Sequence, residues 1–372
     1  MTKVKKILEI IPTLGCGGAE RIVVDLSNEL AKSAEVTILC FQNQEGGDFF
    51  RKRVDRRVKV INIAPRGTAS RVTLILLMFK IWHIIVKLHP DVVHCHIGGV
   101  LISAAAILSH IPDVPYIYTV HNDAFFDADF SLWSRKLLFR LGNVHPVAIS
   151  EESRESFVRA YGFSPPLIVN GVKESIPSAE ALAAVKEEIS SWRSSPGSLL
   201  LMNVARIAPP KNQLALARAV AKVRAEGVEA DVVFIGATGD EGIEREIRNL
   251  NCPGVHVAGV REDPLPYLAQ ADALVLSSVF EGLPITLLEA LSLGVPVCVT
   301  PVGGMKNLVH DGVNGLVASG TSVDDIAALL RRFCALPREE RARLGTAARK
   351  SYEPYSIEKC AASYIELMSG SK

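Results

Sequence analysis

Residues 271–304 read ADALVLSSVFEGLPITLLEALSLGVPVCVTPVGG, and this stretch contains a complete strand–helix–strand unit. The apolar run DALVLSS predicts a buried strand, the segment after Gly282 predicts a helix, and PVCVT predicts a second strand. Strands that alternate with helices pair in parallel, with the helices on the faces of the sheet. Ligands of such sheets bind beyond the carboxyl ends of the strands.

The same alternation runs through the rest of the chain in two series. The first begins with VKKILEIIP (4–12) and ends with PVAIS (146–150), and the second begins near residue 198. Between them, residues 170–198 are polar and rich in Pro, Ser and Gly, which predicts a linker. We therefore predict an α/β protein with two Rossmann-like, doubly wound parallel sheets over residues 1–173 and 174–351, facing a central cleft.

The charge distribution differs between the two halves. Residues 1–173 contain 21 Lys and Arg against 16 Asp and Glu, and the remaining residues contain 20 against 24. This asymmetry predicts that the first half faces an anionic partner. The basic run RKRVDRRVK (51–59) is either a solvated face or a cradle for an anionic membrane or a lipid diphosphate. Nucleic acid is not favoured, since no binding motif is present and the overall pI is near neutral.

Residues 72–88, VTLILLMFKIWHIIVKL, predict an apolar helix with Lys80, His83 and Lys87 on one stripe. This helix is either buried against a sheet or rests on anionic lipid. No apolar run approaches the roughly 18 residues of a membrane span. The seven scattered cysteines, without a C-x-x-C pair, indicate reduced thiols. We predict a cytoplasmic protein that either stays in solution or binds the inner face of the cytoplasmic membrane.

Two loops carry features that suit a phosphate group. TLGCGGAERI (13–22) matches neither the Rossmann fingerprint nor a Walker A loop, but it places Gly17 and Gly18 at a helix start. Bare backbone there binds an anion or makes a tight turn. NVARIAPPKNQ (203–213) places Arg206 at a strand end and Lys211 at a helix start, so the two cations form a phosphate clamp or a pair of solvated charges.

Glu281 and Glu289 flank the predicted helix start at Pro284. Eight helical residues correspond to a rise of roughly 12 Å. A sugar and a ribose joined by a diphosphate span such a distance, and carboxylates accept hydrogen bonds from their hydroxyls. The alternative is a helix with two surface acids.

Glu281 and Glu289 also form the E-x7-E pattern of the retaining family 4 glycosyltransferases, which have the GT-B fold, and the chain resembles that family nearly end to end. The other segments that carry the resemblance are GGAER (17–21), PDVVHCH (90–96), TVHND (119–123), VAISEESRESFVRAYG (147–162), VNGV (169–172), ARIAPPKN (205–212), the quoted stretch 271–304 and DGVNGLV (311–317).

The resemblance implies a role for each matching residue. Glu281 would hold the donor sugar, Glu289 the ribose, and Arg206 with Lys211 the departing diphosphate. The remaining implied donor contacts are His121, backbone at Gly17, Gly18, Gly282 and Leu283, and backbone near Val260 at the base. The family usually needs no metal or other cofactor, and we assign no protein nucleophile. The resemblance also implies that a C-terminal helix over 352–372 packs on the first domain.

Two departures from the family pattern bear on the donor. Asn307 and Lys173 stand where the family often has acids, which puts donor preference in question. Two motifs suggest metal chemistry. His94 and His96 of HCH lack an evident third ligand, so a strand end that lines the cleft explains them better. DAD (127–129) imitates a metal-binding D-x-D, and chance is favoured there. We therefore predict no metal.

The sequence thus predicts a retaining glycosyltransferase that moves a hexose or N-acetylhexosamine from a UDP-sugar to a glycan. A lipid-linked acceptor in surface polysaccharide assembly fits the basic first half. The first alternative is a sugar-nucleotide 2-epimerase of the same architecture, which would convert its substrate without an acceptor. The second is a non-catalytic subunit that binds a nucleotide-sugar for a partner protein.

Overall fold

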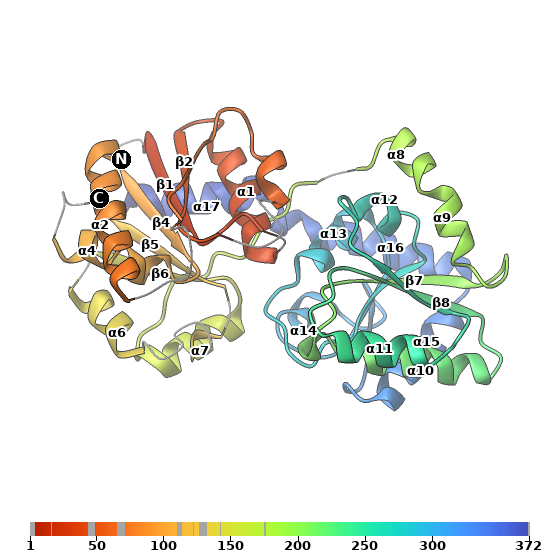
Figure 1. Cartoon of the computed structure of the whole chain (residues 1–372). Coiled ribbons are helices and arrows are strands. Elements are labelled where there is room, and N and C mark those ends of the chain that lie inside the picture. The colour runs from red at the N-terminus through yellow and green to blue at the C-terminus, as the bar shows by residue number, and fades with distance from the viewer. Residues whose placement is uncertain are drawn as a thin grey trace. The chain divides into compact units, whose positions relative to one another are not determined.

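The computed structural model describes residues 4–15, 17–43, 49–64, 71–109, 114–121, 123–125, 132–141, 143–174 and 176–370. The chain divides into two compact units. The first consists of Met1–Lys173 with Tyr355–Lys372, and the second consists of Glu174–Pro354. Each unit has its own six-stranded parallel sheet with helices packed against it (Figure 1). The predicted α/β class with two doubly wound sheets is confirmed.

The sheet of the first unit has the strand order β3-β2-β1-β4-β5-β6. This order belongs to dinucleotide-binding folds, in which the chain reverses its direction of travel between the two central strands. Here the reversal lies between β1 and β4. The strands are β1 (Lys6–Ile11), β2 (Glu35–Cys40), β3 (Lys59–Asn62), β4 (Val92–His96), β5 (Tyr116–Val120) and β6 (Val144–Ala148).

Helices cover both faces of this first sheet, because its strands are apolar on both sides. One face packs against α1 and α17, and the other packs against α2, α3, α4, α6 and α7. The helices are α1 (Gly18–Leu30), α2 (Arg71–Leu88), α3 (Gly99–Ile102), α4 (Ala104–Leu108), α6 (Leu132–Leu141), α7 (Glu151–Tyr161) and α17 (Ile357–Gly370), with 3₁₀ turns η1 (Phe49–Arg53) and η3 (Glu353–Tyr355).

The sheet of the second unit has the order β12-β11-β10-β7-β8-β9, which is the same topology. Its strands are β7 (Leu199–Val204), β8 (Ala230–Ile235), β9 (Val255–Gly259), β10 (Ala273–Leu276), β11 (Val297–Val299) and β12 (Leu316–Val317). Its helices are α8 (Ala179–Ala184), α9 (Lys186–Ser191), η2 (Pro209–Lys211), α10 (Gln213–Ala225), α11 (Glu241–Asn249), α12 (Leu265–Leu268), α13 (Ile285–Leu293), α14 (Met305–Leu308), α15 (Val323–Cys334) and α16 (Arg338–Tyr352).

The predicted linker over 170–198 is wrong where the chain forms two short helices. Residues 179–191 form α8 and α9, and the side chains of Ile189 and Trp192 are buried. Glu188 accepts a hydrogen bond of 2.7 Å from the Tyr267 hydroxyl group and also pairs with Arg261. These short helices bury only a few side chains, so their sequence is as polar as that of a linker.

Helix α2 has a buried stripe and an exposed apolar face. Leu77, Ile81 and Ile85 repeat at four-residue spacing and pack into the core of the first unit. Val72 and Phe79, in contrast, are 65% and 59% exposed. The interpretation of residues 72–88 as a helix buried against a sheet is therefore correct for one side of α2, and the interpretation that it rests on lipid stays a prediction. Within the described part of the chain, no helix combines the length and the apolar character needed to cross a membrane.

Candidate functional site

The second sheet reverses its strand order between β7 and β10. Loops that leave these two strands diverge, which opens a crevice at their carboxyl ends. Arg206 and Lys211 follow β7, and Glu281 follows β10. The topology thus brings Glu281 to the same edge as Arg206 and Lys211, which lie far earlier in the sequence.

Lys211 and Glu281 form an ion pair at this edge. Lys211 Nζ lies 2.5 Å from Glu281 Oε1, and the Ser278 hydroxyl group donates to the same oxygen at 2.8 Å. The Glu281 side chain is only 9% exposed, against 29% for Lys211. A carboxylate with so little solvent depends on these two donors. The ammonium group keeps enough exposure to meet a ligand.

The loop that carries Lys211 is held in place by hydrogen bonds to the end of β10. Asn212 has a positive φ of 56° and ends the 3₁₀ turn. Its Nδ2 donates to the Ser277 carbonyl oxygen at 3.1 Å and to the Thr321 carbonyl oxygen at 2.9 Å. The Ser277 hydroxyl group in turn donates to the Lys211 carbonyl oxygen at 2.9 Å. Lys211 therefore stands on a fixed backbone.

Arg206 begins the same loop and is exposed. Its carbonyl oxygen accepts a hydrogen bond of 2.9 Å from Gln213 Nε2, which ties the loop to the start of α10. The Arg206 side chain lies against Gly239, where a Cβ atom would come within 2.9 Å of Arg206 Cδ. Among the described residues, Arg206 forms no ion pair, so its guanidinium group is open to an anionic ligand.

Glu289 lies on α13, in the second turn of the helix. Pro284 is the N-cap residue and the helix begins at Ile285, one position later than the sequence predicts. Leu283, before this cap, is buried, and so is Glu289, which is 5% exposed. Glu289 is therefore not a surface acid.

A second loop packs directly on the turn that carries Glu281. Gly303 has a φ of 53°, and a Cβ atom on it would overlap the carbonyl oxygen of Glu281. Gly304 N donates to the Gly282 carbonyl oxygen at 2.7 Å. Glycine is needed at position 303 because both the left-handed backbone and the close approach exclude a side chain.

The remaining predicted site residues are Val260 in the second unit and Gly17, Gly18 and His121 in the first unit. Val260 follows β9 and is 48% exposed, and its carbonyl oxygen accepts a hydrogen bond of 3.1 Å from Arg261 Nη1. Gly17 is the N-cap residue of α1, and Gly18 begins that helix in the first unit. The carboxylate of Glu20 folds over Gly17, where a Cβ atom would overlap it. The acidic side chain of Glu20 therefore already lies at the N-terminus of α1.

His121 follows β5 in the first unit and is 9% exposed. Its Nε2 lies 2.9 Å from His96 Nδ1. Burial, together with the nearby charges of His96 and His94, holds the pKa of His121 well below its usual value. The imidazole ring is therefore neutral at pH 7.

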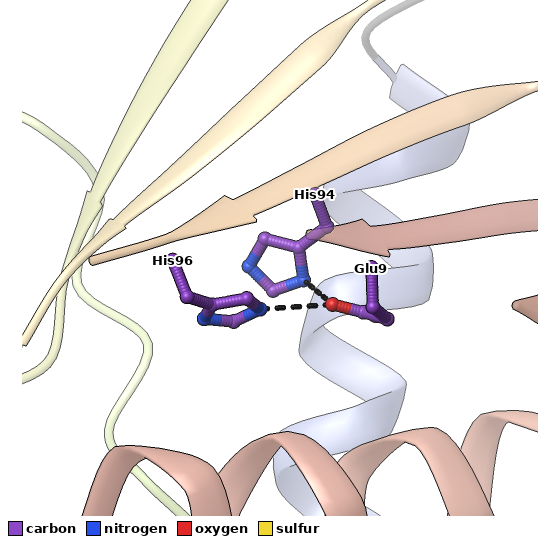
Figure 2. Close-up of side chains that lie close together, drawn as sticks. All are labelled: Glu9, His94 and His96. Carbon is purple, nitrogen blue, oxygen red and sulfur yellow. Dashed lines mark hydrogen bonds and ion pairs between the residues drawn. The ribbon is translucent and has the colours of Figure 1, made fainter. Parts of the chain in front are cut away.

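His94 and His96 do not line an open strand end, so that interpretation of HCH is wrong. Their side chains are 0% and 1% exposed, and the His94 ring lies 4.7 Å from the Tyr364 ring of α17. The sequence did not reveal their acidic partner, Glu9, whose carboxylate lies within 3.0 Å of a nitrogen atom of each ring (Figure 2). Its signal is a single acid within the apolar strand KILEII. The DAD motif (127–129) lies outside the described residues.

Two family models match the chain. The model described as "Glycosyltransferase Family 4" matches residues 16–175, and the model described as "Glycosyl transferases group 1" matches residues 185–351. The two matches fall on the first and second sheets in turn.

Curated relatives and a solved structure agree with these models. The UDP-Gal:α-D-GlcNAc-diphosphoundecaprenol α-1,3-galactosyltransferase of Escherichia coli is 27% identical over 68% of this chain and 69% of the relative. A Campylobacter jejuni α-1,4-N-acetyl-D-galactosaminyltransferase, whose name specifies an undecaprenol-linked glycan, is 24% identical over 98% of both chains. The structure of Anabaena HepE in complex with UDP and glucose aligns with a TM-score of 0.83 at 19% identity, covering 98% of this chain and 100% of HepE.

Proposed function

Because the chain belongs to the family 4 glycosyltransferases and has their GT-B fold, we propose that it transfers a hexose or N-acetylhexosamine from a UDP-sugar to a lipid-linked glycan, with retention of the anomeric configuration. The observation that carries this proposal is the Lys211–Glu281 pair at the reversal point of the second sheet. The proposed setting is surface polysaccharide assembly.

The pair can exchange its partners when a donor binds. The donor diphosphate binds the Lys211 ammonium group in place of Glu281. The Arg206 guanidinium group, from the same loop, forms a bidentate contact with the diphosphate. Glu281 then accepts hydrogen bonds from hydroxyl groups of the donor sugar instead of from Lys211. The start of α13, next to Glu281, adds backbone N–H groups and a favourable helix dipole for the phosphate.

We propose that the positive charges of Arg206 and Lys211 replace a catalytic metal ion. In the bond-breaking step negative charge builds up on the departing diphosphate, and fixed cations stabilise that charge without rearrangement. Glu289, buried on α13, holds the ribose hydroxyl groups. No protein nucleophile is assigned, because retention follows from attack by the acceptor on the face that the diphosphate leaves.

The choice of UDP and of a lipid-linked acceptor rests on the relatives. The E. coli relative is named for UDP-Gal and a diphosphoundecaprenol acceptor, and HepE was solved with UDP and glucose. The basic first half of this chain suits an anionic lipid diphosphate.

We predict that UDP-sugars stabilise the protein more than ADP- or GDP-sugars do. A donor at 100 times its Kd raises the free energy of unfolding by about 2.7 kcal/mol. Differential scanning fluorimetry with a panel of nucleotide-sugars therefore shows a shift of several degrees for the true donor. Glu289→Gln reduces this shift, whereas the control Glu246→Gln, an exposed acid on α11, retains it. A larger shift with ADP- or GDP-sugars, and none with UDP-sugars, would contradict the UDP assignment.

We further propose that the exposed face of α2 rests on an anionic membrane surface. Its large apolar residues stand beside a cation, Lys80, and Trp133 of α6 is 77% exposed on the same unit. Helix α4 contacts both α2 and α6, so the three helices form one continuous side of the first unit.

We predict that the protein floats with phosphatidylglycerol vesicles at low salt and is released at high salt. Ile75→Ser with Phe79→Ser weakens flotation at least tenfold, because each buried apolar side chain contributes about 1.5–3 kcal/mol. Val313→Ser, which removes a 56% exposed apolar side chain from the second unit, is the matched control. Absence of flotation by the unmodified protein, or equal flotation by all three proteins, would rule out this membrane surface.

A further inference from the structure

Strand register places three metal-binding side chains on one face of the first sheet. Glu9 of β1 pairs directly with His94 of β4, so their side chains emerge on the same side. His96 lies two residues further along β4 and emerges on that side as well. Glu9 Oε2 lies 3.0 Å from His94 Nδ1 and 2.8 Å from His96 Nε2. Figure 2 shows both rings turned toward this carboxylate oxygen.

In each imidazole ring, the nitrogen that faces Glu9 is called the inner nitrogen, and the other is the outer nitrogen. Each outer nitrogen has a hydrogen-bond partner. His94 Nε2 lies 2.7 Å from the Thr119 hydroxyl group, which is 2.8 Å from the Tyr364 hydroxyl group of α17. His96 Nδ1 lies 2.9 Å from His121 Nε2. When the outer nitrogens carry the protons, the inner nitrogens of both rings present lone pairs to Glu9. Outer partners of this kind orient the histidines of metal sites.

The inner atoms are incompletely satisfied without a cation. Glu9 Oε1 and His94 Nδ1 are buried and have no hydrogen-bond partner among the described residues, although Nδ1 lies at ion-pair distance from Oε2. A buried carboxylate oxygen and a buried ring nitrogen that lack hydrogen-bond partners favour a bound cation.

We propose that Glu9, His94 and His96 bind one divalent transition-metal ion, with zinc as the best match. Two imidazole nitrogens and one carboxylate oxygen are a donor set that zinc accepts, and the ligand atoms already lie within 4.8 Å of one another. Tetrahedral zinc with bonds near 2.0–2.1 Å separates its ligand atoms by roughly 3.3 Å, so the side chains need to move apart by only a few tenths of an ångström. A water molecule fills the fourth position.

The metal serves the structure of the first unit rather than sugar transfer. The three side chains are 0–1% exposed, so no substrate reaches the ion. Through His94, Thr119 and Tyr364 the site connects the sheet to α17, which is far away in the sequence. Through His96 it also fixes the ring of His121. This site is independent of the proposed metal-free chemistry at Lys211 and Glu281.

Because the proposed site is buried, the experiment can distinguish zinc bound there from zinc bound at the protein surface. The full chain is produced without a tag in zinc-supplemented medium and dialysed against EDTA, which removes exposed ions. We expect about one equivalent of zinc per chain to remain in the folded protein and to be released to a chromophoric chelator when guanidinium unfolds it. Protein grown with cobalt shows the visible absorption of tetrahedral Co²⁺.

Variants assign the ion to its ligands. His96→Asn retains less than about one tenth of the zinc, and Thr119→Val, which leaves the ligands in place, binds it about 10–100-fold more weakly. His145→Asn is the control, because that ring pairs with Asn143 outside the cluster. If the unmodified protein releases no transition metal after EDTA dialysis, the proposal is overturned even where a variant fails to fold. Equal zinc in His96→Asn and His145→Asn overturns it as well.

Discussion

Lys211→Met lowers kcat for sugar transfer by about 10²–10³-fold, because the departing diphosphate loses a fixed positive charge. Methionine preserves most of the aliphatic length of lysine, so the packing around the 3₁₀ turn η2 changes little. The substitution also leaves the Ser278 hydroxyl group as the only donor to the Glu281 carboxylate among the described residues. Lys211→Met with Glu281→Gln removes this unpaired charge, so we expect its stability to recover while kcat stays low.

The matched control is Lys222→Met on α10. Lys222 Nζ lies 2.7 Å from Asp324 in an exposed ion pair, so the control makes the same charge change in the same unit. Its expected effect on kcat is within a factor of two, since exposed pairs contribute less than about 1 kcal/mol. The measurement is steady-state transfer by the purified protein with a saturating donor. Full turnover by both Lys211→Met and Glu281→Ala would show that the site is elsewhere, or that the protein binds nucleotide-sugars without catalysis.

The fold was accessible from the sequence because its signals are local. The central parallel strands are buried on both faces and therefore form short apolar runs, as in ALVL of β10. Each helix between the strands has its own periodicity. The position of α17 does not follow from such local signals. This helix belongs to the first unit because Tyr364 and its neighbours pack on a sheet formed by residues more than 200 positions earlier. Only the family resemblance predicted that return.

The candidate site was accessible only in part. Sequence analysis named Lys211 and Glu281 separately, but their ion pair joins residues 70 positions apart and depends on the pairing of β7 with β10. Asn212 and Ser278 were missed, because an amide or hydroxyl group in a loop carries no signal until its partner is known. Glu9 was missed as a partner of His96 for the same reason, since strand pairing across 87 positions brings the two together.

The second large effect is expected at Gly303. Gly303→Ala lowers kcat by about 10²-fold, because its Cβ atom displaces the Glu281 carbonyl oxygen, and an error of about 1 Å in a catalytic group has that cost. The same change places a side chain at a φ of 53°, which costs about 1–2 kcal/mol of stability. Activity and stability must therefore be separated.

The control variant Gly227→Ala separates the loss of activity from the loss of stability. Gly227 also has a left-handed backbone, with a φ of 90°, but a Cβ atom there meets nothing within 4 Å. Alanine introduces the same kind of backbone strain at both positions. Only Gly303→Ala also clashes with the turn that holds Glu281. We expect urea denaturation to show that both variants remain folded, with the larger loss in the free energy of unfolding in Gly303→Ala, and we expect a loss of kcat in Gly303→Ala alone. Similar kcat values in the two variants would mean that the close approach of Gly303 does not position Glu281 for transfer.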